Sequence, residues 1–491
     1  MKITEAKQQI ENAMRAYFDK DEFGNYRIPV EEQRPVFLMG PPGLGKTAVV
    51  QQVAAEMGVG LVSYSMTHHT RQSALGLPFI QSKKYGGRQT SVTEYTMSEI
   101  IAAVYDVMEE TGVREGILFL DEINCVSETL TPAMLEFLQF KRFGRHQVPP
   151  GWIVLTAGNP PEYNRSAHEF DYVTWDRLKR VDVEPDFDVW KKYAYAVDTH
   201  AAILTYLEIK KENFYRIETA ADGRRFVTAR GWTNLSVMLR EYERLGLPVD
   251  VGLIGQYLQF PEVAEDFANY FELFAAYQSD YQVDAILAGR PPEEILQRAR
   301  HAEFDERLSL LGLLLDAVAA DFRDVSEREA VAGDLLPALR AVKSAPDPGA
   351  ALASELASRR EACARAARRG ALDPAAQARF ARVERFLQSA LQKRVEFAAL
   401  KTAYDELVGA LRDAVARTGA RLQALFSFAE AAFDENEMLI LVAELTCNPH
   451  AARFIGRYGC APYYAHNEEL LFYERQKEII TELEKLDLEL K

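Results

Sequence analysis

The sequence is poor in cysteine and contains no long hydrophobic run. Its four cysteines (Cys125, Cys363, Cys447 and Cys460) are scattered over 491 residues without CxxC spacing. This argues against a disulfide framework and favours free, buried thiols in a reducing cytoplasm. The longest apolar runs, such as Leu308 to Leu315, are far too short to cross a bilayer, so no membrane span is expected.

Positive charge is outnumbered by negative charge, with 57 lysines and arginines against 73 aspartates and glutamates. The formal net charge is −16, and an acidic chain repels phosphate backbones, so nucleic acid is disfavoured as a partner. The N-terminal segment is charged and amphipathic and has no apolar core. No secretory signal is therefore predicted, and a cytoplasmic location is expected. Between residues 212 and 400 the only lysines are Lys343 and Lys393, which marks a change of composition in the second half.

The remaining composition is that of a globular protein. Hydrophobic residues make up 48% and charged residues 26%, which argues against long disordered segments. A chain of this length is expected to form two to four domains.

The first part of the chain alternates short apolar strands with helices, which predicts a parallel sheet covered by helices on both faces. Residues 77–95 predict a β-hairpin with its turn at Gly86-Gly87. Lys141, Arg142, Arg145 and His146 predict a basic surface patch. The predicted strands are 35–39, 61–66, 117–120 and 152–157, and the predicted helices are 3–18, 47–57, 98–112 and 132–140.

After Pro185 the pattern becomes helical, with one small hairpin around residues 214–228. A linker-like break spans 341–350, and apolar residues from Phe380 to Leu411 are spaced as on one long helix in a bundle or coiled-coil hairpin. The expected domains are an α/β nucleotide-binding core, a helical lid with a small hairpin, a helical accessory module, and a tail that packs on the lid or the accessory module. Their ranges are 1–183, 184–290, 291–434 and 435–491.

The strongest local pattern is a glycine-rich turn between a predicted strand and a predicted helix. It matches G-x-x-x-x-G-K-[ST] in full, and this context is the one that a phosphate-binding loop requires. Backbone N–H groups and the helix N-terminus attract phosphate, Lys46 is expected at the β- and γ-phosphates, and Thr47 is expected to bind Mg²⁺. The residues expected to contact ATP are Gly40, Pro41, Pro42, Gly43, Leu44, Gly45, Lys46, Thr47 and Ala48.

Two later strands deliver polar residues at their ends. The strand 117–120 is followed by Asp121 and Glu122, and we expect Asp121 at the Mg²⁺ ion and Glu122 polarising the attacking water. Asn159 follows the strand 152–157 and is expected to orient that water near the γ-phosphate. An ordinary strand-end acid or turn asparagine remains the alternative for each position.

Together these segments resemble an AAA+ ATPase of the MoxR family, in the dynein-related subgroup. The resemblance covers roughly residues 1–290 and rests on GPPGLGKT, LFLDEIN, TAGNPPEYNRS and WDRLKRVDVEPD. The hairpin at 77–95 resembles the helix-2 insert of that clade, which faces the central pore of a ring.

The resemblance assigns further roles. Asn159 matches sensor 1, Arg177 matches the arginine finger, and Arg230 matches the sensor 2 arginine that opens a lid helix. This chain has Leu178 where the family has phenylalanine, and Arg180 remains an alternative finger. The catalytic set that follows is Lys46, Glu122, Asn159 and Arg177.

The resemblance also implies a homo-oligomeric ring, by family a hexamer, because a finger in trans makes hydrolysis depend on the neighbouring subunit. It implies a protein substrate, a von Willebrand factor A domain partner and a chaperone-like activity such as metal-cofactor insertion. Two alternatives remain open: a nucleotide-gated scaffold that binds a partner through its helical module, and a nucleic-acid motor, against which the acidic balance counts.

Overall fold

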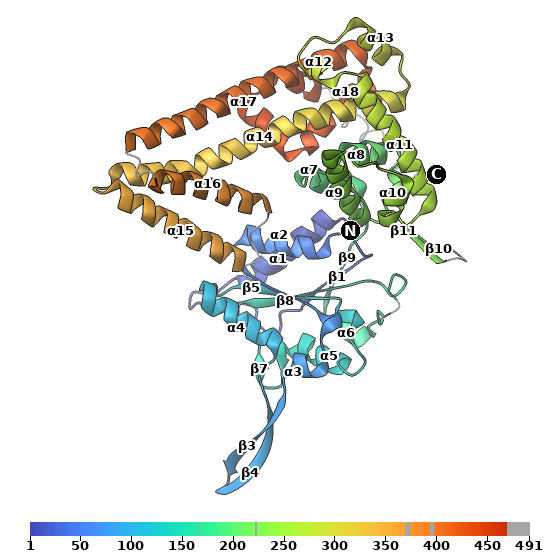
Figure 1. Cartoon of the computed structure of the whole chain (residues 1–491). Coiled ribbons are helices and arrows are strands. Elements are labelled where there is room, and N and C mark those ends of the chain that lie inside the picture. The colour runs from blue at the N-terminus through green and yellow to red at the C-terminus, as the bar shows by residue number, and fades with distance from the viewer. Residues whose placement is uncertain (165, 221–222, 369–373, 393–396, 469–491) are drawn as a thin grey trace. The chain divides into compact units, whose positions relative to one another are not determined.

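A computed structural model describes the chain except residues 165, 221–222, 369–373, 393–396 and 469–491 (Figure 1). The chain divides into two compact units, Met1–Val189 with Ala357–Phe380, and Trp190–Leu356 with Ala381–Lys491. The finer predicted division at 183, 290 and 434 stays a prediction. Among the described residues, no helix combines the length and apolar character that crossing a bilayer demands.

The first unit is built on a five-stranded parallel sheet with strand order β2-β5-β8-β1-β9. The four predicted strands are confirmed, and β9 is a fifth that the sequence analysis missed. Of its four residues only Val181 is buried, so β9 has no apolar run to reveal it. The strands are β1 (Val36–Met39), β2 (Gly60–Ser65), β5 (Gly116–Asp121), β8 (Trp152–Gly158) and β9 (Lys179–Asp182).

Helices cover both faces of this sheet (Figure 1). Successive residues of a strand point to opposite faces, so Val36 and Leu38 of β1 pack with α1 and α2, while Phe37 and Met39 join the core with α4 and α5. The predicted α/β core is therefore confirmed. The helices of this part are α1 (Ile3–Phe18), α2 (Lys46–Met57), α3 (Arg71–Leu75), α4 (Glu99–Thr111), α5 (Thr131–Phe140) and α6 (Tyr172–Trp175).

Glycine fixes the packing of three neighbouring strands. Gly60 of β2 and Gly116 of β5 lie beneath the indole ring of the fully buried Trp152 of β8. A Cβ atom on Gly116 would lie 2.7 Å from that ring, closer than packed atoms approach each other. The two glycines therefore make the space in which Trp152 lies.

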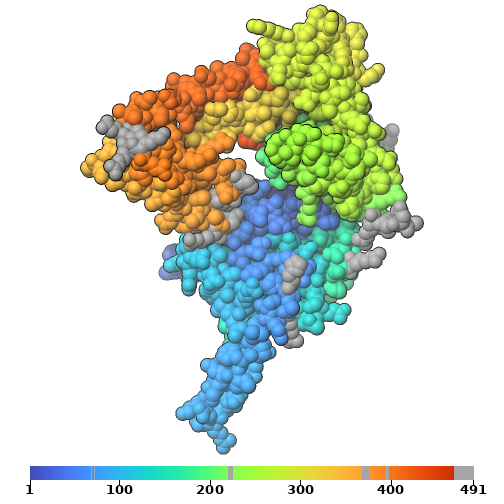
Figure 2. All heavy atoms as spheres, in the orientation of Figure 1, coloured from blue at the N-terminus to red at the C-terminus, as the bar shows by residue number. Residues whose placement is uncertain are grey.

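The predicted hairpin is confirmed as β3 (Pro78–Tyr85) and β4 (Arg88–Tyr95). Both turn residues have positive φ, 55° at Gly86 and 84° at Gly87, as a two-residue hairpin turn of type I′ requires. The hairpin projects away from the sheet of its unit (Figures 1 and 2).

A second, very short hairpin formed by β6 (Arg142–Phe143) and β7 (His146–Gln147) follows α5. The prediction of a basic surface patch is wrong for Lys141. This residue is only 1% exposed, and its ammonium donates to the carbonyl of Val30. Burial lowers the pKa of Lys141 to about 8. Arg145 instead donates to Glu94 of β4 at 2.6 Å, which ties this short hairpin to the long one.

The second unit is a long helical region with one small hairpin, β10 (Arg216–Ala220) and β11 (Gly223–Val227). The hairpin was predicted, and its turn at 221–222 lies outside the described residues. The helices from residue 187 onward are listed next, and most of α15 and the start of α16 belong to the first unit. They are α7 (Phe187–Ala196), α8 (Ala201–Ile209), α9 (Ala229–Leu245), α10 (Val251–Tyr257), α11 (Pro261–Asp280), α12 (Val283–Leu287), α13 (Glu293–His301), α14 (Phe304–Ser344), α15 (Pro348–Arg368), α16 (Pro374–Gln392), α17 (Phe397–Ala432), α18 (Glu435–Cys447) and α19 (Pro449–Tyr458).

The longest helices, α14 and α17, lie side by side and antiparallel (Figure 1). The single helix predicted from Phe380 to Leu411 is wrong, since this stretch forms α16 and the first part of α17. Val383 of α16 and Leu400 of α17 pack into one cluster with Leu335 of α14. Both helices pack against α14, so both have apolar residues at three- and four-residue spacings. In the sequence the two sets of apolar residues therefore resemble the apolar face of one continuous helix.

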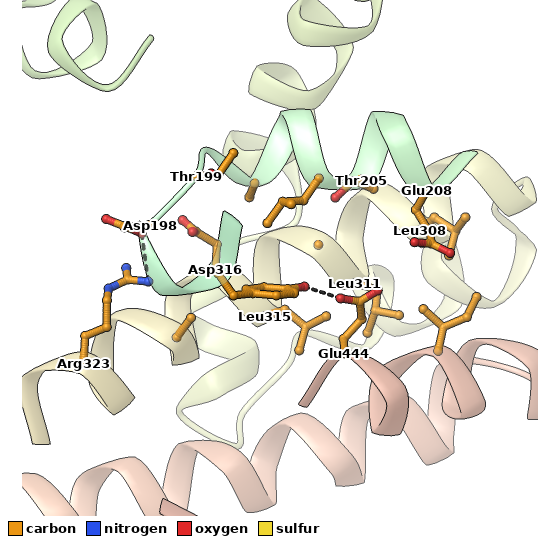
Figure 3. Close-up of a pocket in the computed structure, with 16 residues that line it drawn as sticks. Asp198, Thr199, Thr205, Glu208, Leu308, Leu311, Leu315, Asp316, Arg323 and Glu444 are labelled. Carbon is orange, nitrogen blue, oxygen red and sulfur yellow. Dashed lines mark hydrogen bonds and ion pairs between the residues drawn. The ribbon is translucent and has the colours of Figure 1, made fainter. Parts of the chain in front are cut away.

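A cavity of about 40 Å³ lies within the second unit, among α7, α8, α14 and α18 (Figure 3). At its wall, Tyr195 and Lys191 of α7 both donate to the buried carboxylate of Glu444 on α18, and Lys191 also donates to Glu208 at 2.6 Å. These bonds fasten α18 to α7 and α8. The residues that line the cavity include none of the predicted site residues, so it plays no part in the site below.

Candidate functional site

The predicted phosphate-binding loop joins β1 directly to the N-terminus of α2. Gly43 and Gly45 have φ values of 81° and 83°, in the left-handed region that favours glycine. A Cβ atom on Gly40 would lie 2.6 Å from the carbonyl oxygen of Val183. Glycine is therefore needed at three positions of the loop, and α2 starts at Lys46.

Lys46 is brought together with Asn159. Its side chain is buried, with 8% exposed, and its ammonium donates to the carbonyl oxygens of Gly40 and Pro41 at 2.8 and 2.9 Å and to Asn159 Oδ1 at 2.9 Å. The contact arises because β1 and β8 are neighbouring parallel strands, so the residues that follow them meet at the same edge of the sheet.

Thr47 is brought together with Asp121. The Thr47 hydroxyl donates to Asp121 Oδ2 at 2.8 Å, and the other carboxylate oxygen accepts from the backbone N–H of Glu122 at 2.9 Å. A hydroxyl and a carboxylate are hard oxygen ligands of the kind that Mg²⁺ prefers. The two residues therefore fit the predicted magnesium site.

Glu122 has an unusual backbone for a residue with a side chain, with φ 54° and ψ 36°. Such left-handed conformations are uncommon outside glycine and cluster at functional sites. The carboxylate accepts a 3.4 Å hydrogen bond from the hydroxyl of Ser65, at the end of the neighbouring strand β2. This turn aims the Glu122 side chain along the carboxyl edge of the sheet instead of letting β5 continue.

Asn124 is a residue that the sequence analysis missed. It is only 1% exposed, and its side-chain amide donates to the carbonyl oxygen of Asn159 at 2.8 Å. A Cβ atom on Gly158 would lie 2.4 Å from Asn124 Oδ1. Asn124 therefore connects the ends of β5 and β8. The sequence gives only a weak signal for this role. Asn124 is a polar residue that closely follows Asp121 and Glu122, and a glycine, Gly158, stands directly before Asn159.

Cys125 lies beside this connection and is half-buried. Burial raises the pKa of its thiol, and the carboxylates of Glu122 and Asp121 raise it further. Asn164 donates to the sulfur at 3.2 Å. A thiol with a raised pKa is a poor nucleophile, so Cys125 belongs to the packing of the site. All four cysteines are half-buried and outside any disulfide among the described residues.

The two candidate finger arginines differ in their surroundings. Arg180 Nε donates to Asp182 at 2.8 Å, and its guanidinium lies 4.7 Å from the centre of the Trp175 ring. Arg177 is exposed, and no hydrogen bond or ion pair of its guanidinium appears within the described part of the chain. Leu178 is buried in the core beneath, so leucine fills the position where the family has phenylalanine.

The register of β9 fixes where Arg177 lies. Lys179 pairs with Val36 at the start of β1, and Asp182 pairs with Met39 at its end. Arg177 precedes β9 and therefore lies at the amino edge of the sheet, whereas the loop after Met39 lies at the carboxyl edge. At about 3.3 Å per residue, the three steps from Val36 to Met39 separate the two edges by about 10 Å along the strand direction. An arginine side chain is shorter than this distance.

Arg230 belongs to the second unit. It is the second residue of α9, whose N-cap Thr228 accepts a hydrogen bond from the N–H of Gly231 at 3.2 Å. The predicted helix start at this position is confirmed, and Arg230 is exposed.

Comparison with known proteins agrees with this geometry. Residues 35–178 match the model of the AAA domain of the dynein-related subfamily. The chain contains an AAA domain. The matched range holds every predicted site residue except Arg230 and the alternative finger Arg180, and domains of this family are nucleotide-hydrolysing ATPases. The assignment to the MoxR family stays a prediction.

Among solved structures, the chain is similar to a point mutant of RuvB from Thermotoga maritima. The identity is 14%, over 52% of this chain and 69% of that chain, with a TM-score of 0.28. A likeness this low says nothing about substrate or partner. No curated protein matches the chain.

Proposed function

We propose that the chain hydrolyses ATP as a subunit of a MoxR-like ring and uses the energy to remodel a protein partner. The observation that carries this proposal is the meeting of Lys46, Thr47, Asp121 and Asn159 at the carboxyl edge of one sheet. An AAA domain with this full set of side chains has the parts that phosphoryl transfer needs.

Each side chain has a distinct task in the proposal. Lys46 exchanges its carbonyl partners for the β- and γ-phosphates, and Asn159 beside it orients the attacking water. Glu122 polarises that water. Thr47 and Asp121 would hold Mg²⁺, which would neutralise charge on the phosphates. Lys46 and Thr47 open α2, so the N-terminus of that helix adds its own attraction for phosphate.

The position of Arg177 supports a finger that acts in trans. It lies at the edge of the sheet opposite its own phosphate-binding loop, and it is exposed. We therefore assign the finger role to Arg177 rather than Arg180, and we expect a ring, with six subunits by analogy with the family. A finger of this kind raises the rate by about 10³–10⁵. Arg230 is the proposed sensor 2 residue.

The proposed substrate is a protein rather than a nucleic acid, because the chain carries a net charge of −16. Remodelling through a von Willebrand factor A domain partner, including insertion of a metal cofactor, is the form of this activity that the family resemblance favours.

The test is ATP turnover by the full chain over a range of protein concentrations. We expect the rate per subunit to rise with concentration, Lys46→Ala to abolish nucleotide binding, and Glu122→Gln to bind ATP without hydrolysing it. Lys401→Ala and Glu128→Gln, at exposed positions, are matched controls that keep wild-type activity. Absence of turnover at every concentration, or an unaltered rate in Lys46→Ala, would overturn the proposal.

A further inference from the structure

The most exposed aromatic side chain of the first unit lies five residues before Arg177. Tyr172 is 94% exposed, and Val173 beside it is 58% exposed. Single exposed apolar residues are common on protein surfaces. Here two adjacent ones lie in the segment that also carries the proposed finger.

The segment is rigid because its other side is anchored in the core. Asp171 caps α6 by accepting a 2.8 Å hydrogen bond from the N–H of Thr174. The ring of Trp175 packs edge-on against Phe37 of β1, with centroids 5.2 Å apart, and Leu178 is buried. Tyr172 and Val173 are therefore displayed by a short helix whose remaining residues hold it in place, and presenting them to a partner costs little ordering entropy.

We propose that Tyr172 and Val173 are an anchor that a second copy of this chain buries when Arg177 reaches that copy's nucleotide. The inference rests on the proposed function, because it is the trans finger that specifies a second copy. The second copy fits this segment in two ways. The cationic Arg177 needs an anionic partner, and in the proposed ring the phosphates of the neighbouring site supply it. The apolar Tyr172 and Val173 need a protein surface that excludes water from them.

The choice of residue type agrees with this role. Tyrosine is enriched at the energetic centres of protein interfaces, because it buries a large area while fixing few rotatable bonds. A buried aromatic next to a charged contact also excludes water from it, and this strengthens the electrostatic interaction. In the proposed ring, Tyr172 therefore contributes to assembly and holds Arg177 in register with the phosphates.

The test compares Tyr172→Ala with Tyr105→Ala, an exposed tyrosine of α4 in the same unit (38% exposed). Assembly is followed by sedimentation velocity of the full chain with Mg²⁺ and a slowly hydrolysed ATP analogue over a concentration series. We expect Tyr172→Ala to raise the concentration of half-assembly by about tenfold or more, with Tyr105→Ala and Tyr172→Phe unchanged. Binding of a fluorescent ATP analogue by the dilute chain should be equal in all variants.

The outcomes separate this inference from the function on which it rests. If the wild type assembles and Arg177→Ala loses turnover, but Tyr172→Ala assembles within twofold of wild type, the anchor is refuted and the trans finger stands. If the wild type neither assembles nor gains activity with concentration, both proposals fall together. Because the Tyr172 side chain is almost wholly exposed, its replacement leaves the fold intact, and circular dichroism of the variant checks this.

Discussion

Replacement of Asn124 tests whether a buried side chain that contacts no substrate sets the rate of the proposed reaction. Its amide is the hydrogen-bond donor to the carbonyl of Asn159, at 2.8 Å. In Asn124→Leu the side chain keeps its approximate size, but this carbonyl loses its partner within a nearly closed environment. Leaving such a group unsatisfied costs about 1–3 kcal/mol.

The structure indicates that this cost affects the position of Asn159. Asn159 also accepts from Lys46 through its side chain, so any shift of Asn159 changes the group that orients the attacking water. A loss of about 2 kcal/mol in the transition state corresponds to roughly a 30-fold fall in kcat. The KM for ATP should change less than about threefold, because none of the hydrogen bonds of Asn124 in the described part of the chain goes to the phosphate-binding loop.

Steady-state turnover of the assembled protein measures both constants, and a double-mutant cycle with Asn159→Ala decides the mechanism. If Asn124 acts through Asn159, the double variant is no slower than Asn159→Ala alone. A variant that melts at a lower temperature but keeps kcat within threefold of wild type would show that Asn124 serves only packing. Fully additive losses in the cycle would equally refute the link to Asn159.

Two further predictions concern stability. The pKa of buried Lys141 falls from 10.5 to about 8, so the unfolded chain binds more protons between those values and stability rises with pH. From pH 7 to 9.5 the first unit should gain about 2 kcal/mol relative to Lys141→Met. Urea unfolding measures this through the fluorescence of Trp152 and Trp175 in a variant lacking the tryptophans of the second unit, and a flat difference would contradict the lowered pKa. Gly116→Ala places a methyl group against Trp152 and should cost about 1–3 kcal/mol by the same assay, whereas Gly409→Ala, which lies in the second unit with open space around it, should leave this first-unit signal unchanged.

The sequence predicted those features whose cause is local. The loop from Gly40 to Thr47 is determined by positive φ at glycines and by the helix that follows, and the hairpin turn by Gly86 and Gly87. Apolar runs revealed four strands of the sheet. Each of these signals lies within about ten residues, so no knowledge of distant contacts was needed.

The features that were missed or wrong depend on distant partners. β9 is short and mostly polar, and it becomes a strand because β1 offers an unpaired edge. Lys141 resembles a surface lysine until its helix end is placed beside Val30, 111 residues away. Asn124 matters only because β5 and β8 are neighbours.

The strand that the sequence did not reveal is also the one on which the proposed dependence on a neighbouring subunit rests. β1 ends in the phosphate-binding loop, and β9, paired with it in parallel, begins just after Arg177. One rigid strand pair therefore carries a nucleotide site at one edge and an exposed arginine at the other, with Trp175 packed on Phe37 between them. In the proposed ring, we expect a shift of the loop on nucleotide binding to be transmitted through this pair to the edge that carries Arg177. Substituting Phe37 should therefore impair cooperativity between subunits more than it impairs ATP binding, whereas equal losses in both would place the coupling elsewhere.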